Sequence, residues 1–173
     1  MEVTYYFDGM EDLYDNNMQK ILVPSSKVVR CDMKPEMNAS VVLKETLDSM
    51  ENDDDFILVN FTNPDSLAHT GNLSACIHGL ESVDECLKQI IDKANENFYE
   101  VVITSSHGNC EDMKDSNGDI NVSNTTNKVP FIILNKEYNL KDDGSLIDVI
   151  PTLIDMYQIN KPTEMTGESL IIR

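Results

Sequence analysis

The stretch that most constrains the fold is a short apolar run over residues 56–59, followed by Asn63-Pro64 and a long amphipathic segment. The run, Phe-Ile-Leu-Val, is rich in residues that favour β-structure, which predicts a buried strand. Asn63-Pro64 predicts the end of that strand. Over residues 73–95, apolar residues recur at helical spacing, which predicts a long helix packed on a sheet.

The same alternation continues along the chain and predicts an α/β fold with a mainly parallel sheet flanked by helices. Further helices are expected over residues 39–50 and 146–157, and further strands over residues 3–7, 101–104 and 129–134. At 173 residues the chain is long enough to bury one core, so we expect a single domain over residues 1–173.

Polar side chains follow two of the expected strands at their carboxyl ends. Asp65 and His69 come after the strand over residues 56–59, and His107 comes after the strand over residues 101–104. Ligands of open α/β sheets bind at such ends. An Asp and a His in this position can share one divalent cation. The alternative is that Asp65 caps a turn and His69 is an ordinary loop histidine.

The charge of the chain excludes several classes of partner. The formal net charge is −18, and the arginines are Arg30 and Arg173 alone. Such a surface repels nucleic acid and anionic membranes, and it offers few clamps for a phosphorylated acid. The chain has no apolar run of membrane-spanning length and no signal peptide, so we expect a cytoplasmic protein.

Six motifs in a fixed order relate nearly the whole chain to a known family. They are LVPSSKV, NPDSLAHTGN, LESVDECL, ITSSHGN, NTTNKVPFIIL and EMTGESLI. In order and spacing they resemble the C-terminal third of the cofactor-independent (2,3-bisphosphoglycerate-independent) phosphoglycerate mutases of the alkaline-phosphatase superfamily. The resemblance implies an alkaline-phosphatase-like fold, of which this chain forms the C-terminal part of the metal-binding domain.

The resemblance also implies a chemistry and its ligands. Family members are glycolytic isomerases that move phosphate between the 3- and 2-hydroxyls of glycerate, with a serine nucleophile and two manganese ions. It places Asp65 and His69 on one ion, with a histidine where this chain has Asn124. It places His107 on the other ion, after an aspartate where this chain has Ser106. The nucleophile, a basic residue before the first strand and the phosphate-clamping arginines lie upstream in the family.

These substitutions predict weak metal binding. An amide is a poorer ligand than imidazole, and losing a carboxylate lowers affinity further. We therefore expect at most one manganese ion, bound weakly through Asp65, His69 and His107, and no catalytic residue within the chain. Cys110, three residues after His107, is an alternative ligand as a thiolate.

Two interpretations follow. In the first, the chain is a degenerate relative, a pseudoenzyme inactive by itself that acts as a binding or interaction module. In the second, it is the C-terminal part of a working manganese-dependent mutase, which handles phosphoglycerate only when the missing parts complete it. A third interpretation, a one-metal hydrolase, lacks a marked nucleophile. The family's sheet contains an interior strand from upstream, so we expect this chain to re-pair its strands, self-associate or bind a protein partner.

Overall fold

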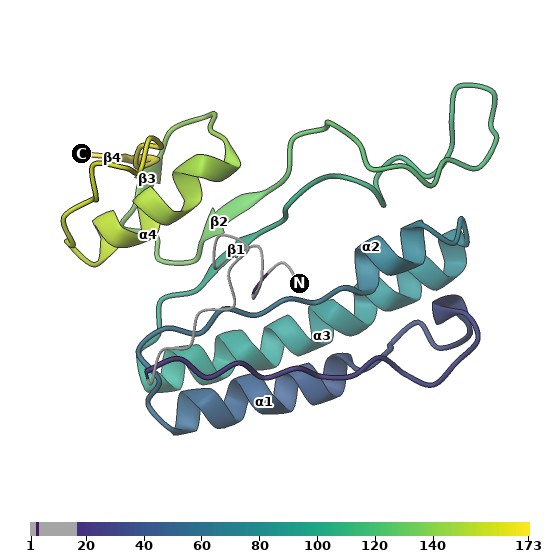
Figure 1. The fold of residues 1–173 in the computed structure, drawn as a ribbon, viewed down its shortest axis with the longest axis horizontal. Coiled ribbons are helices and arrows are strands. Elements are labelled where there is room, and N and C mark those ends of the chain that lie inside the picture. The colour runs from purple at the N-terminus through teal and green to yellow at the C-terminus, as the bar shows by residue number, and fades with distance from the viewer. Residues whose placement is uncertain (1–2, 4–16) are drawn as a thin grey trace. The chain divides into compact units, whose positions relative to one another are not determined.

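The computed structural model describes Val3 and residues 17–173 (Figure 1). It divides into two compact units, Met1–Tyr99 with His107–Lys128, and Glu100–Ser106 with Val129–Arg173. Apart from Val3, the strand expected over residues 3–7 lies outside the described residues. None of the helices in the described part of the chain combines the length and apolar character of a membrane-spanning segment.

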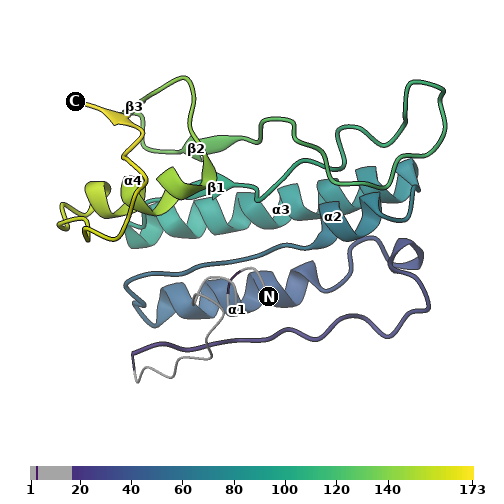
Figure 2. The ribbon, with the colours of Figure 1, turned by 45° about the horizontal axis from the view of Figure 1, so that its top comes forward.

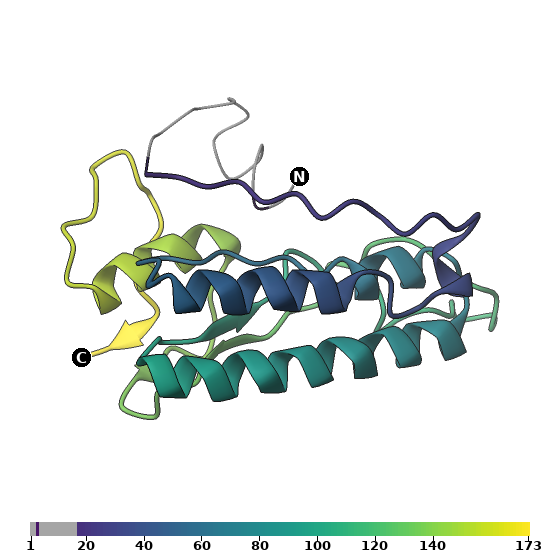
Figure 3. The same ribbon diagram turned by 90° about the horizontal axis from the view of Figure 1, so that it is seen from below.

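The first unit is built on helices. These are the short 3₁₀ helix η1 (Cys31–Met33), α1 (Ala39–Glu51), α2 (Asn63–Ala68) and α3 (Leu73–Asn97). Helices α1 and α3 run side by side (Figure 3), and α2 packs on α3. The helices expected over residues 39–50 and 73–95 are thus confirmed, each to within two residues at its ends.

Helix α3 forms because its sequence supplies both a start and a buried face. Asn72 caps the helix, since its side-chain oxygen accepts a hydrogen bond from the Ala75 N–H at 3.1 Å. The chain leaves the helix at Phe98, which adopts a left-handed conformation with φ 62°. The buried residues recur at intervals of three or four and form one stripe: Ala75, Cys76, Gly79, Val83, Cys86, Ile90 and Ala94.

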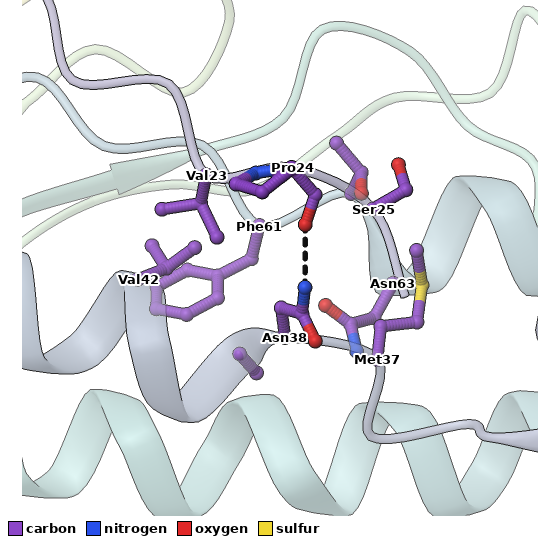
Figure 4. A pocket seen from close by; sticks show the side chains of 10 residues that line it. Val23, Pro24, Ser25, Met37, Asn38, Val42, Phe61 and Asn63 are labelled. Atoms are coloured by element: carbon purple, nitrogen blue, oxygen red, sulfur yellow. Dashed lines mark hydrogen bonds between the residues drawn. The ribbon is translucent and has the colours of Figure 1, made fainter. Parts of the chain in front are cut away.

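The segment before α1 runs along that helix (Figure 2). Asn38 fastens it there: its Nδ2 donates to the carbonyl of Pro24, and its Oδ1 accepts from the Ser26 hydroxyl at 2.7 Å. Figure 4 shows the first of these bonds at a pocket that Val23, Val42 and Phe61 also line. Asn38 therefore ties the preceding segment to α1, and its side chain makes no capping bond to the helix itself.

A small apolar cluster joins α2, α3 and a later loop. Its members are Leu67, Ala68, Ala75, Cys76 and Met113, all at most 6% exposed. Leu67 is fully buried, and a Cβ added at Gly79 of α3 would overlap its side chain. The glycine thus permits the close approach of α2 to α3.

The second unit contains the paired strands. β1 (Val102–Thr104) pairs with β2 (Phe131–Ile133), and β3 (Asn139–Leu140) pairs with β4 (Ile171–Ile172). The 3₁₀ helix η2 (Leu146–Asp148) leads into α4 (Val149–Met156), which confirms the helix expected over residues 146–157. The strands expected over residues 101–104 and 129–134 are confirmed as shorter elements.

Two details of the expected sheet differ from the structure. Both strand pairs are antiparallel, so the parallel pairing that we expected is not formed among the described residues. The run over residues 56–59 belongs to no strand there, and Phe56 and Leu58 are 51% and 40% exposed. The physical reason is that a strand forms only by pairing with a neighbour, and no ladder to this run is formed among the described residues.

We predict that backbone amides of residues 56–60 exchange with solvent much faster than those at Val83, Cys86 and Ile90 of α3. Residues 56–60 form no strand pairing among the described residues, whereas the three residues of α3 lie in its buried stripe. Hydrogen exchange of the dilute monomer, followed by NMR or mass spectrometry, measures this. Comparable protection of the two segments would contradict the prediction, and protection of residues 56–60 only on association would indicate an added strand.

Candidate metal centre

Helix α2 places Asp65 and His69 next to each other. Asn63 anchors its start, since its buried amide donates to the carbonyls of Pro35 at 2.9 Å and Glu36 at 3.0 Å. Pro64 lies in the first turn, where a helix tolerates proline. Asp65 and His69 are four residues apart and so share one face. Asn63-Pro64 therefore begins a helix that presents both side chains together.

The ring of His69 is oriented by the backbone. Its Nδ1 lies 2.5 Å from the carbonyl oxygen of Val122. A carbonyl only accepts, so Nδ1 carries the proton and, in the neutral ring, Nε2 presents a lone pair. Nε2 lies 3.1 Å from Asp65 Oδ1, which is also an acceptor. Metal-binding histidines typically donate their second nitrogen to a carbonyl in this way.

His107 is oriented in the same manner. Its Nδ1 lies 3.2 Å from the carbonyl oxygen of Gly108, and its Nε2 faces Asp65 and Asn124. That Nε2 lies 3.9 Å from Asp65 Oδ1 and 3.5 Å from Asn124 Nδ2. Two imidazole nitrogens therefore approach the same carboxylate oxygen. Imidazole nitrogens and a carboxylate oxygen are the kinds of atom that bind divalent cations, so this convergence is the basis for considering a metal centre here.

Two asparagines complete the cluster. Asn109 Nδ2 donates to Asp65 Oδ1 at 2.9 Å and to Asn124 Oδ1 at 3.2 Å, and it lies 3.3 Å from His69 Nε2. Asn109 is buried, whereas Asp65 and His69 have side chains 46% and 45% exposed. The cluster is thus open to solvent on the side of Asp65 and His69 and closed at Asn109.

Glu111 holds the two loops that carry His107 and Asn124. Its Oε2 accepts the Asn109 backbone N–H at 2.7 Å, and its Oε1 accepts from the Thr125 hydroxyl and from Asn127 Nδ2. The Thr125 N–H donates to the Gly108 carbonyl at 2.8 Å. Hydrogen bonds from Thr125 and then Asn127 lower the pKa of Glu111 to about 2, so the carboxylate is charged at neutral pH.

The structure brings together most residues that the sequence singled out. Asp65, His69, His107 and Asn124 meet in the first unit, whereas Ser106 belongs to the second. Within Val3 and residues 17–173, no three His, Cys, Asp or Glu side chains are arranged so that together they could hold a metal ion. His107 is the more distant imidazole, and the neutral amide of Asn124 stands where the resemblance implied a third strong ligand. Asp65 and His69 are thus the close pair of potential ligands, with His107 farther away.

Sequence analysis missed three participants: Asn109, Glu111 and the carbonyl of Val122. The position of Asn109 in the ITSSHGN motif was the one signal that could have identified it. Nothing in the sequence indicated Glu111 or the carbonyl of Val122. Cys110 does not serve as the alternative ligand, because it packs against the apolar cluster. Burial and the nearby Glu111 carboxylate raise the pKa of its thiol, which disfavours a thiolate.

Known proteins resemble this chain over nearly its whole length. The family profile of the metalloenzyme superfamily matches residues 1–161. The chain belongs to the metalloenzyme superfamily. Its relatives include the 2,3-bisphosphoglycerate-independent phosphoglycerate mutases of Aster yellows witches'-broom phytoplasma (strain AYWB) and Clostridioides difficile (strain 630). This member of the superfamily is 43% identical to the first over 170 residues and 42% identical to the second over 174 residues.

The match covers 98% of this chain but only 33% and 34% of those two relatives, so the chain spans about a third of their length. A solved structure of Leishmania mexicana phosphoglycerate mutase, determined at low cobalt concentration, is 28% identical with a TM-score of 0.87. It is matched over 98% of this chain and 35% of its own. The predicted resemblance and the alkaline-phosphatase-like α/β fold class, as a partial domain, are confirmed.

We predict that Glu111→Gln lowers the melting temperature by a few degrees at pH 7, because a neutral amide replaces the charged acceptor of three donors. The folded-state pKa of about 2 lies below the unfolded value of about 4.3. The stabilisation is therefore complete above about pH 4.3 and is lost as the pH falls toward 2.

Thermal unfolding of wild type and variant between pH 2.5 and 7 measures this difference. The control is Glu96→Gln, which removes an exposed carboxylate from α3 in the same unit. A difference between wild type and Glu111→Gln that stays constant over this pH range would contradict the assigned role of the carboxylate.

Proposed function

We propose that this chain carries a single, weakened divalent-cation site of the phosphoglycerate-mutase type and acts by binding, without catalysing a reaction by itself. The observation that carries the proposal is the approach of His69 Nε2 and His107 Nε2 to one oxygen of Asp65, at 3.1 and 3.9 Å. Both rings keep their other nitrogen on a backbone carbonyl. Manganese is the cation that the family resemblance suggests.

The composition of the site explains why its affinity should be low. Among the described residues, Asp65 is the single carboxylate of the converging atoms, and Asn124 contributes a neutral amide. Divalent cations are held by charge and by the number of ligands, so one carboxylate and two imidazoles make a modest site. With the side chain partly exposed, solvent also screens the carboxylate.

A second candidate function is supported by the comparisons. Relatives more than 40% identical over 98% of this chain are named phosphoglycerate mutases. In this alternative, the chain is the C-terminal part of a cytoplasmic mutase that interconverts 3- and 2-phosphoglycerate. Another polypeptide or segment would supply the remaining parts. The bound cation would then stabilise phosphoryl oxygens, and this chain's residues would hold it in place.

An exposed apolar segment supports the view that the chain associates with a further strand. Phe56 and Leu58 are exposed, and residues 56–60 pair with no strand in the described part of the chain. An extended segment of this kind can accept a strand from a partner chain or from a second copy, which buries both its backbone groups and its side chains.

The first prediction from this proposal concerns turnover. Purified chain with manganese should interconvert 3- and 2-phosphoglycerate no faster than a buffer blank, in a coupled assay free of host mutase. The same assay is then repeated with the remaining two thirds of the Clostridioides difficile relative added as a separate chain. Metal-dependent turnover of the isolated chain would contradict the proposal. Turnover that appears only in a formed complex would favour the second candidate.

The second prediction concerns the stoichiometry and strength of binding. Manganese titration followed by water-proton relaxation should show at most one equivalent, weakly held. The substitution Asn124→His should tighten binding by about 10–100-fold, because it replaces a neutral amide with an imidazole. As a control, Asp65→Ala should abolish binding. Two tightly held equivalents in wild type would contradict a single weakened site.

A further inference from the structure

The side-chain nitrogen of Asn109 lies among the atoms that would hold a cation. It is within 3.3 Å of Asp65 Oδ1, His69 Nε2 and Asn124 Oδ1. An amide NH₂ has two hydrogens for these three acceptors. When no cation is bound, the partial positive charge of this NH₂ group therefore interacts with the lone pairs of the three acceptors.

The other end of the same amide is in the opposite situation. Asn109 is 4% exposed, and its Oδ1 is buried and receives no hydrogen bond. Buried carbonyl oxygens in folded proteins are nearly always paired, so an orphaned one beside a candidate site suggests a role for it. The donors that would normally satisfy this oxygen are absent on the side to which it points among the described residues.

We propose that Asn109 is itself a ligand of the cation, and that its amide rotates about the Cβ–Cγ bond when the cation binds. The inference rests on the proposed cation site. A cation takes the lone pairs of Asp65 and His69, so the NH₂ group loses its acceptors and faces positive charge. Rotation removes this conflict and presents Oδ1, a type of ligand that hard divalent cations accept. It breaks no hydrogen bond of Oδ1, because Oδ1 makes none.

The surroundings confine this rotation to the side chain. Glu111 Oε2 holds the Asn109 backbone N–H at 2.7 Å, and the neighbouring Gly108 carbonyl accepts from the Thr125 N–H at 2.8 Å. The backbone on both sides of the amide is therefore fixed, and no loop has to move for the ligand to change. Asn109 then adds an oxygen to a site in which Asn124 is the weak member.

Substitution by aspartate tests whether Asn109 faces the cation. Asn109→Asp keeps the shape of the side chain, adds an anionic oxygen and removes the NH₂ group. We expect manganese to bind about tenfold more tightly or better, measured by calorimetry. The matched control is Asn95→Asp, which adds the same charge at an exposed position of the same unit and should change affinity much less. Equal affinities of the two variants would overturn the proposal.

A second measurement uses the unaltered chain and does not depend on a variant that folds. In the cation-free protein, NMR should show a nuclear Overhauser effect between the Asn109 side-chain NH₂ and the ring protons of His69. Saturation with zinc, a diamagnetic cation, should abolish this effect while the backbone resonance of Asn109 remains. Persistence of the effect at saturation would overturn the rotation alone. Failure of the wild-type chain to bind either manganese or zinc would overturn the proposed cation site as well.

Discussion

The arrangement of the polar site depends on the packing of one apolar residue, Leu67. Helix α2 has six residues, too few to be stable as an isolated helix, and Leu67 fixes it to α3 by complete burial. The same cluster includes Met113, from the loop that follows His107. A single apolar contact region therefore fixes Asp65 and His69 on one side and the loop of His107 on the other. Loss of the Leu67 side chain would cost about 2–5 kcal/mol and would release both halves of the site.

Two sets of hydrogen bonds organise the polar site. Backbone carbonyls of Val122 and Gly108 direct the Nε2 atoms of the two histidines toward Asp65. Glu111 ties together the loops that carry Asn109 and Asn124. The two histidine rings are oriented as the proposed cation site requires, although the resemblance implies stronger ligands at two positions. Oriented histidines together with weakened ligand positions support the proposal that the chain binds one cation and does not catalyse a reaction by itself.

Helical periodicity was enough to predict the long helix α3, because it follows from local spacing. A site that combines Asp65, His69 and His107 was predicted from their positions after the expected strands and from the family motifs, since His107 is distant from the other two in sequence. The run over residues 56–59 was mispredicted as a buried strand, since strand formation depends on a neighbour that the run itself does not encode. Asn63-Pro64 was interpreted as a break, but these residues begin the helix α2. A helix of six residues is too short for its hydrophobic pattern to be told apart from that of a loop. The roles of Asn109 and Glu111 depend on contacts between loops far apart in sequence, so residue type alone could not reveal them.

The most direct test of the central claim is pulsed electron paramagnetic resonance of the manganese-loaded chain, which detects ¹⁴N nuclei bound to the ion. The account predicts couplings from two imidazole nitrogens. His69→Ala and His107→Ala should each remove one coupling, whereas substitution of His78, on the outer part of α3, should remove neither. Bound manganese without nitrogen coupling, or with couplings unchanged in both variants, would contradict a cation site built from Asp65, His69 and His107.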